Sequence, residues 1–312
     1  MYSKTDLIKN YLNNKYIPDF MKSVLLFARL YFDTKITHFT EVESKKEREC
    51  QLLLDVISPD SNINSLLKKM GKTSLIIHNE TWKFGGIQHG ENYIFGRLGK
   101  IKGHIYNFFD EKNKDFIKSE FHEANLCNFL IDLDNHIIVY ESRRNIGEKA
   151  PILVIQDTFN SFFDNAEKIH INLITDNRKI IDRIRELNSI IEIKMKLNPT
   201  NPDSTPSSDK MDQFLKELNA DKIKIEASSS KGIDLEGGGG LIQSGLRLAE
   251  EGYGYVQVKG IMITPHKQQK IELINLFNLP MKEREDLSES DKIAINQLKK
   301  KIKSVIELLN VE

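Results

Sequence analysis

The feature that most constrains the fold is a run of short apolar segments between Ser74 and Ser142, separated by glycine, asparagine or aspartate. The segments are SLIIH, WKFGGI, YIFGRLGKI, HIYNFF, CNFLIDL and HIIVYES. Their length and their β-branched and aromatic content are typical of strands, and residues 133–136 (LDNH) have the composition of a tight hairpin turn. Residues 74–142 are therefore predicted to form an antiparallel sheet.

Helix-like and strand-like patterns alternate on both sides of this sheet. SVLLFARLYFD reads as a buried strand, and Lys194 and Lys224 give the later strands a half-polar character. Such strands favour a sheet that helices cover on one side only. The expected helices are 3–16, 45–57, 61–70, 151–164, 178–188, MDQFLKELN and LIQSGLRLAEEG, and the expected later strands are 168–174, 190–197, KIKIEAS and YVQVKGIMI.

The predicted fold class is α+β. An N-terminal mixed region with the antiparallel sheet (1–150) precedes an α/β layer of β-α-β-α-β-α-β order (151–265), and a helical tail (266–312) ends the chain. In the tail, one face of an amphipathic helix carries an apolar stripe. The stripe either closes the core of its own chain or joins two copies, and a homodimer through 290–310 is the favoured interpretation. The stripe consists of Ile295, Leu298, Ile302 and Leu309.

Composition limits the partners of this chain. Its 312 residues contain 45 Lys and Arg against 45 Asp and Glu, so any contact with nucleic acid must come from a local basic patch. Cys50 and Cys127 form no CxxC pair, which fits a reducing compartment. The N-terminal residues contain no apolar core of a signal peptide. We expect a cytoplasmic protein that does not insert into a membrane.

Four consecutive glycines, Gly237, Gly238, Gly239 and Gly240, lie between an expected strand and an expected helix. The run does not fit the G-x-G-x-x-G dinucleotide fingerprint, because the sixth position from Gly237 is Ile242. Backbone amides before a helix can still bind a phosphate. The run is thus a phosphate-loop candidate, although a simple linker into helix 241–251 is the favoured interpretation.

Glu192 and Lys194 form an E-x-K on an expected strand, which is half of the signature of Mg²⁺-dependent nucleases. The second acidic residue of that signature has no candidate on a preceding strand. The eight histidines show no metal-site spacing, so we assign no catalytic residue, no metal ligand and no cofactor.

Basic residues beside aromatic ones give a stronger signal. The stretch YIFGRLGKIKGHIY contains Arg97, Lys100 and Lys102 among its aromatic residues and glycines. Cationic side chains beside aromatic rings can bind phosphate groups while the rings stack on bases. The predicted nucleic-acid-binding residues are Arg97, Lys100, Lys102, Arg143, Arg144 and Lys231, with Lys222 and Lys224 bordering the glycine run.

The stretches YIFGRLGK, LNPTNPDS and GYGYVQVKG follow one another in an order that resembles the RexA-type phage-exclusion proteins and related bacterial proteins found near phage-defence genes. The resemblance covers roughly residues 90–265 and brings no catalytic residue with it. It implies a cytoplasmic DNA-binding or sensor component that acts with a second protein. The longer N-terminal region and the lysine-faced C-terminal helix depart from the pattern.

The function predicted from the sequence is therefore a non-enzymatic, DNA-binding component of a phage-defence or prophage exclusion system. Nucleic acid and a second defence protein are the expected partners. Two alternatives stay open, namely a Mg²⁺-dependent nuclease that uses Glu192 and Lys194, and a protein-interaction module without nucleic acid.

Overall fold

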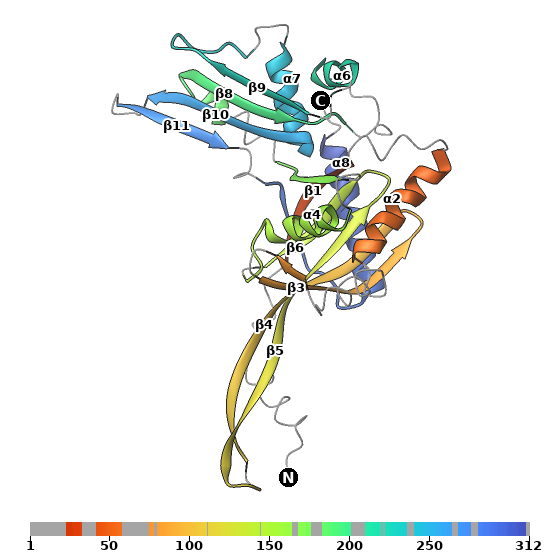
Figure 1. The fold of residues 1–312 in the computed structure, drawn as a ribbon. Helices are drawn as coiled ribbons and strands as arrows, with labels where there is room; N and C mark the ends of the chain where they lie inside the picture. Colours follow the sequence, from red (N-terminus) through yellow and green to blue (C-terminus); the bar gives the residue numbers. More distant parts are fainter. Residues whose placement is uncertain are drawn as a thin grey trace.

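Two antiparallel sheets, the helices around them and a long two-stranded ribbon make up the fold (Figure 1). The structure is a computed structural model of the chain. It describes residues 23–32, 42–57, 75–77, 80–110, 112–143, 145–163, 168–175, 183–200, 210–218, 220, 222–235, 240–263, 268–275 and 280–309. The predicted fold class is confirmed, because the structure is mixed α+β with antiparallel sheets and a C-terminal helix.

The larger sheet has eight strands in the order β12-β1-β6-β5-β4-β3-β2, with β7 also paired to β1. β1 pairs with β6 along one edge, while its other edge is shared end to end by β12 and β7. The strands of this sheet are β1 (Ser23–Phe32), β2 (Leu75–Ile77), β3 (Glu80–Gly90), β4 (Tyr93–Asp110), β5 (Asp115–Asp132), β6 (Ile137–Ser142), β7 (Ile169–Leu173) and β12 (Lys282–Glu285).

Helices cover both faces of the larger sheet. Leu26 and Leu30 of β1 pack in one core with α2 (Val42–Ile57) and α4 (Ala150–Phe162). Leu25 and Phe27, which alternate with them, pack in a second core with α8 (Asp291–Leu309). A strand that is buried on both faces is apolar at most positions, which explains the composition of β1, whose single charged residue is Arg29.

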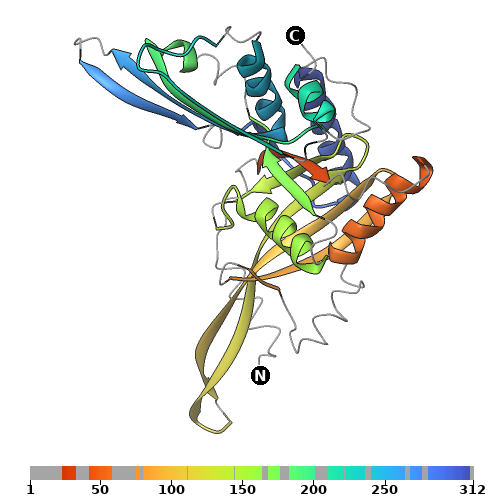
Figure 2. The same cartoon turned by 45° about the horizontal axis from the view of Figure 1, so that its top comes forward.

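β4 and β5 continue far beyond the strands beside them. They pair with each other from Tyr93 and Asp132 out to Asp110 and Asp115, whereas β3 accompanies β4 only as far as Ile101. The outer half projects from the body as a twisted ribbon (Figures 1 and 2). The sequence predicted two separate strands in β4 and none at 115–126, because exposed polar residues interrupt the apolar pattern where no third layer of the described residues covers the ribbon.

The smaller sheet has the order β11-β10-β8-β9 and is antiparallel throughout. Two short helices pack on one face, where Met195 and Val258 meet Leu215 and Leu246. In the described residues no helix covers the other face, which we call the open face. This arrangement agrees with the sheet covered on one side that the sequence predicts. The elements are β8 (Ser189–Leu197), α6 (Lys210–Glu217), β9 (Ile223–Ser228), α7 (Leu241–Leu248), β10 (Gly254–Ile263) and β11 (Gln269–Asn275).

Several segments lie elsewhere than the sequence suggested. The strand expected at 168–174 joins the larger sheet as β7, and 266–312 contains β11 and β12 before α8. Only residues 183–185 of the helix expected at 178–188 are described as helical. The expected helices 3–16 and 61–70 lie outside the described residues. No helix in the described part of the chain is both long and apolar enough to span a membrane.

A π-helical turn, η3 (Ala249–Tyr253), connects α7 to β10 and touches both sheets. The Arg29 side chain of β1 donates hydrogen bonds to the carbonyl oxygens of Glu251 (3.0 Å) and Asn135 (2.8 Å). Gly252 has a φ of 90°, and a Cβ added there would lie 2.5 Å from the Arg29 Cβ. A glycine is therefore required where the smaller sheet meets β1.

Candidate functional site

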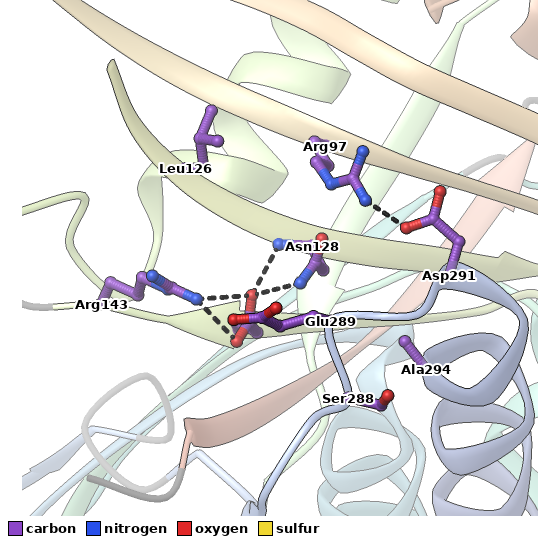
Figure 3. Close-up of a pocket in the computed structure, with 9 residues that line it drawn as sticks. Arg97, Leu126, Asn128, Arg143, Ser288, Glu289, Asp291 and Ala294 are labelled. Atoms are coloured by element: carbon purple, nitrogen blue, oxygen red, sulfur yellow. Dashed lines mark hydrogen bonds and ion pairs between the residues drawn. The ribbon is translucent and has the colours of Figure 1, made fainter. Parts of the chain in front are cut away.

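Two of the predicted basic residues, Arg97 and Arg143, line the same pocket (Figure 3). The pocket has a volume of about 240 Å³ and lies between the larger sheet and the start of α8. Residues from β4, β5, β6 and the N-terminal end of α8 contribute to its wall. They are Arg97, Leu126, Asn128, Glu141, Arg143, Ser288, Glu289, Asp291 and Ala294.

A buried carboxylate, Glu141, organises one side of this pocket. It accepts hydrogen bonds from Ser23 Oγ (2.6 Å) and from the backbone and side-chain nitrogens of Asn128 (2.9 and 2.8 Å). Arg143 donates to the same carboxylate at 3.1 and 3.3 Å. The Glu141 side chain is 1 % exposed, so its charge is balanced by Arg143 rather than by water.

The other side of the pocket is an ion pair between Arg97 and Asp291, the first residue of α8, and Gln88 also donates to Asp291 at 2.6 Å. An acidic residue in the first turn stabilises a helix, and the ion pair fixes that turn on the sheet. Lys100 forms an ion pair with Glu80. The charges of Arg97, Lys100 and Arg143 are thus used within the chain to hold elements together. Lys102 is exposed, and Arg144 lies outside the described residues.

Of the phosphate-loop candidate, only Gly240 is described, whereas Gly237, Gly238 and Gly239 lie outside the described residues. Gly240 is the N-cap of α7 with a φ of 80°, a left-handed conformation that favours glycine. Lys231 is exposed, and its backbone nitrogen donates to Ser229 Oγ at 3.2 Å. Gly240 therefore begins a helix, and the affinity of the glycine run for a phosphate stays a prediction.

The E-x-K residues lie on the open face of the smaller sheet. Lys194 Nζ contacts Glu192 Oε1 at 2.8 Å and Glu226 Oε1 at 3.0 Å. The hydrogen bond from Lys194 lowers the pKa of Glu192. Within the described ranges, no group of three or more His, Cys, Asp or Glu side chains is arranged to hold a metal ion. In the middle of the open face, one lysine thus bridges two carboxylates.

The next row of the open face has a different composition. Lys196 of β8 lies opposite Lys224 of β9, and Tyr255 of β10 lies on the other side of Lys196. Lys222, which directly precedes β9, lies close to Lys196. The nearby ammonium group of Lys196, partial burial and the charge of Lys224 lower the pKa of Lys222 to about 8. We call Lys196, Lys222 and Lys224 the lysine corner.

Polar side chains with hydrogen-bonding capacity adjoin the lysine corner. Gln257 lies opposite Lys194 on one side and Asn275 on the other. Asn275 Nδ2 donates to the Tyr255 hydroxyl at 3.3 Å. The open face therefore offers cations for phosphate, an aromatic ring for stacking and amides that can bind base edges.

The sequence alone does not bring these lysines together. Lys224 indicates only a half-polar strand, and Lys222 and Lys224 border the glycine run. Alternation along each strand puts Lys194 and Lys196 on one face, and likewise Lys224 and Glu226. The pairing register between β8 and β9 decides which of these residues meet, and no local pattern contains that register.

The stretches behind the RexA resemblance have structural roles. In LNPTNPDS, the Asp212 carboxylate of α6 accepts hydrogen bonds from the backbone nitrogen (2.7 Å) and the hydroxyl (2.9 Å) of Thr200. In GYGYVQVKG, a Cβ at Gly254 would lie 2.6 Å from the carbonyl oxygen of Lys196. Thr200, Asp212 and Gly254 thus pack the smaller sheet, whereas residues 201–204 of the first stretch lie outside the described residues.

Residues 71–303 match the protein family described as "Domain of unknown function (DUF4747)". The matched region runs from just before β2 into α8 and covers well over half of the chain, so the chain belongs to this family. No curated protein matches the sequence. The relation to phage-exclusion proteins thus stays a prediction from the sequence.

Proposed function

We propose that this member of the DUF4747 family is a non-enzymatic protein that binds single-stranded nucleic acid on the open face of its smaller sheet. The observation that carries the proposal is the lysine corner. Three lysines from two neighbouring strands gather beside Tyr255, and among the described residues no carboxylate forms an ion pair with any of them. Phosphate groups would supply the missing negative charge.

The energetics of the corner support a ligand rather than a purely structural role. Like charges directly opposite each other on adjacent strands destabilise a sheet. One row away, the same two strands place Lys194 between Glu192 and Glu226, so favourable pairing is attainable at this surface. A bound phosphate would remove the repulsion among the lysines and would raise the pKa of Lys222 from its value of about 8. Binding near pH 8 should therefore take up protons and weaken as the pH rises.

The shape of the open face favours single strands over duplex. A four-stranded antiparallel sheet with helices on one side presents a broad surface on which splayed bases can stack on aromatic rings. Tyr255 supplies one such ring next to Lys196, and Gln257 and Asn275 lie in the adjoining row. Neighbouring positions of β8, β10 and β11 thus carry a lysine for phosphate, a ring for stacking and amides for hydrogen bonds to bases.

The setting implied by the RexA resemblance is a phage-defence or prophage exclusion system, in which a second defence protein would act with this chain. This part of the proposal is supported only by the order of the three sequence stretches. It predicts that expressing the chain with its neighbouring genes lowers the plating efficiency of phage. Equal plating with and without the chain would remove the defence setting and leave the binding site as proposed.

The binding site is tested by fluorescence anisotropy with labelled 20-nucleotide single strands and a matched duplex over a salt series. In one variant, Lys196→Gln, Lys222→Gln and Lys224→Gln are combined. We expect affinity for the single strand to fall by at least about tenfold at 0.1 M salt, and the slope of log K against log salt to become shallower by about 2. Because the substitutions remove repulsion, the melting temperature should stay equal or rise.

The matched control combines Arg97→Gln, Lys100→Gln and Lys102→Gln, which removes the same charge from the larger sheet. We expect its affinity to stay within about twofold of the wild type, since Arg97 and Lys100 are balanced by carboxylates of their own chain and the charge of the exposed Lys102 is screened by salt. Equal losses in both triple variants would show that only overall charge matters. A wild type that binds no nucleic acid contradicts the proposal. Mg²⁺-dependent cleavage that Glu192→Gln abolishes would establish the nuclease alternative.

A further inference from the structure

The edge of the smaller sheet opposite the lysine corner is the strand β11. In the part of the chain that the structure describes, β11 pairs with β10 on one side and with no strand on the other. An edge strand carries backbone N–H and C=O groups that can pair with another strand, and proteins usually protect such edges with charges, proline or bulges. Among the described positions of β11, Gln269–Asn275, only Lys270 and Glu272 are charged.

Apolar side chains next to this edge are exposed to solvent. The exposed fractions are 62 % for Ile271, 54 % for Leu273 and 48 % for Ile263. Ile271 lies opposite Ile261 of β10 and Leu273 opposite Lys259, which places both on the open face. Neighbouring exposed apolar side chains beside an unpaired strand edge are typical of an interaction surface.

The sequence of β11 is complementary to itself in one antiparallel register. With a two-fold axis at Ile271, Lys270 of one copy lies opposite Glu272 of the other, and the reverse pair repeats the contact. Ile271 then faces its own counterpart, and Gln269 faces Leu273. With the axis at Glu272 instead, the two Glu272 side chains would oppose each other. Charge therefore favours the register centred on Ile271 over the one centred on Glu272, and it adds a contact between copies to the ion pairs that Glu272 makes with Arg183 (2.9 Å) and Lys270 (3.1 Å) of its own chain.

We infer that β11 pairs with β11 of a second copy of this chain, so that two four-stranded sheets become one eight-stranded sheet. The axis is perpendicular to the sheet, so both open faces lie on the same side, with a lysine corner at each far end. The interface differs from the one predicted at 290–310. Ile295, Leu298 and Ile302 of α8 are buried against their own chain, so that stripe is already covered. The inference does not depend on nucleic-acid binding.

The first test measures mass by sedimentation velocity from 1 to 100 µM. The wild type should reach twice the chain mass of 36.0 kDa. Ile271→Asp places a carboxylate opposite itself on the axis and should weaken association by at least about tenfold. The matched control is Ile105→Asp on the β4–β5 ribbon, where the side chain is 72 % exposed, and it should leave the dimer intact. Circular dichroism checks that both variants are folded.

The second test uses charge reversal and does not depend on an apolar substitution. Lys270→Glu alone places two carboxylates opposite each other across the interface, and Glu272→Lys alone places two ammonium groups opposite each other. Each variant should therefore associate more weakly than the wild type. In a heterodimer of the two variants, both contacts join a carboxylate to an ammonium group, so the mixture should associate more strongly than either variant alone.

The double variant that combines Lys270→Glu with Glu272→Lys restores both contacts with the charges exchanged. It should associate about as strongly as the wild type, and clearly more strongly than either single variant. This recovery depends on the register, because only the pairing centred on Ile271 places positions 270 and 272 of the two copies opposite each other.

Three outcomes would overturn the inference. These are a wild type that stays monomeric over the whole concentration range, a dimer that Ile105→Asp disrupts while Ile271→Asp does not, and a double charge-reversed variant that associates no better than the single ones. The last result would exclude the register centred on Ile271 even if a dimer exists.

Discussion

The two sheets of this protein differ in whether their basic side chains form ion pairs with carboxylates. In the larger sheet, which helices cover on both faces, Arg97, Lys100 and Arg143 each form an ion pair with a carboxylate. In the smaller sheet, one face is open, and its lysine corner gathers positive charge without an ion-paired carboxylate among the described residues. A basic residue is therefore available to a ligand only where the fold leaves its charge without a carboxylate partner. Neither the number of basic residues in the chain nor the neighbours of one residue in the sequence indicate where this occurs.

Apolar surface shows the same contrast. The stripe of α8 has the spacing of a dimer interface, yet it is buried in the core of the larger sheet. The exposed apolar side chains of β11 span only a short stretch of sequence, but they lie at an unpaired edge of the described sheet. Outside the β4–β5 ribbon, where Ile105 is exposed, the larger sheet thus uses its charged and apolar groups mainly to fold, whereas the smaller sheet leaves some of both for partners.

The largest effect expected from this comparison is on the stability of the larger sheet. Glu141→Ala would leave the Asn128 nitrogens and Ser23 without their buried acceptor, and it would remove the carboxylate that pairs with Arg143. We expect a loss of about 2–4 kcal/mol in the free energy of unfolding, the range typical of breaking a buried, hydrogen-bonded charge pair. Urea denaturation measures it.

The nucleic-acid affinity of the folded fraction of Glu141→Ala should be unchanged, because the carboxylate serves the larger sheet alone. If this variant were as stable as the wild type, or if it folded but no longer bound nucleic acid, the division of roles between the two sheets would be wrong.

A smaller effect is expected from another buried glutamate, Glu250 of η3, whose Oε1 has no hydrogen-bond partner within the described part of the chain. Burial raises the pKa of this carboxyl to about 8, whereas the unfolded chain has the ordinary value near 4.5. The folded state therefore holds a proton that the unfolded state releases. Its stabilising contribution is complete below about pH 4.5 and is lost progressively as the pH rises to about 8.

Glu250→Gln keeps the shape of the side chain and removes this titration. Melting temperatures measured between pH 5 and pH 9 should fall less steeply for the variant than for the wild type. The two proteins should differ most at pH 9, where the variant should be the more stable. Parallel curves would mean that Glu250 is solvated or paired, and that the contrast with the fully hydrogen-bonded Glu141 does not hold.

Local sequence patterns predicted much of the fold but little of the candidate site. Turn residues and alternating apolar segments identified the sheet over 74–142, and the half-polar strands identified a sheet with helices on one side. Contacts between distant residues were not predictable in this way. Arg97 and Asp291 are 194 positions apart, and nothing near either residue indicates that they pair.

Strands whose partners are distant in sequence were also missed or misplaced. β7 and β12 share one edge of β1 although more than a hundred residues separate them in the chain. The lysine corner depends likewise on the register between β8 and β9, which a loop and a helix separate. Periodicity reports which residues share a face, whereas pairing is decided by packing across the whole molecule.

The most direct test of the account is the point of contact with bound nucleic acid. A 20-nucleotide single strand that carries 5-bromouracil can be cross-linked to the protein by ultraviolet light, and the modified peptide can be sequenced by mass spectrometry. The account predicts a cross-link at or beside Tyr255 in β10, which disappears when Lys196, Lys222 and Lys224 are all changed to Gln. Cross-links confined to the β4–β5 ribbon or to the pocket of Arg97 and Arg143, with β10 unmodified, would contradict it.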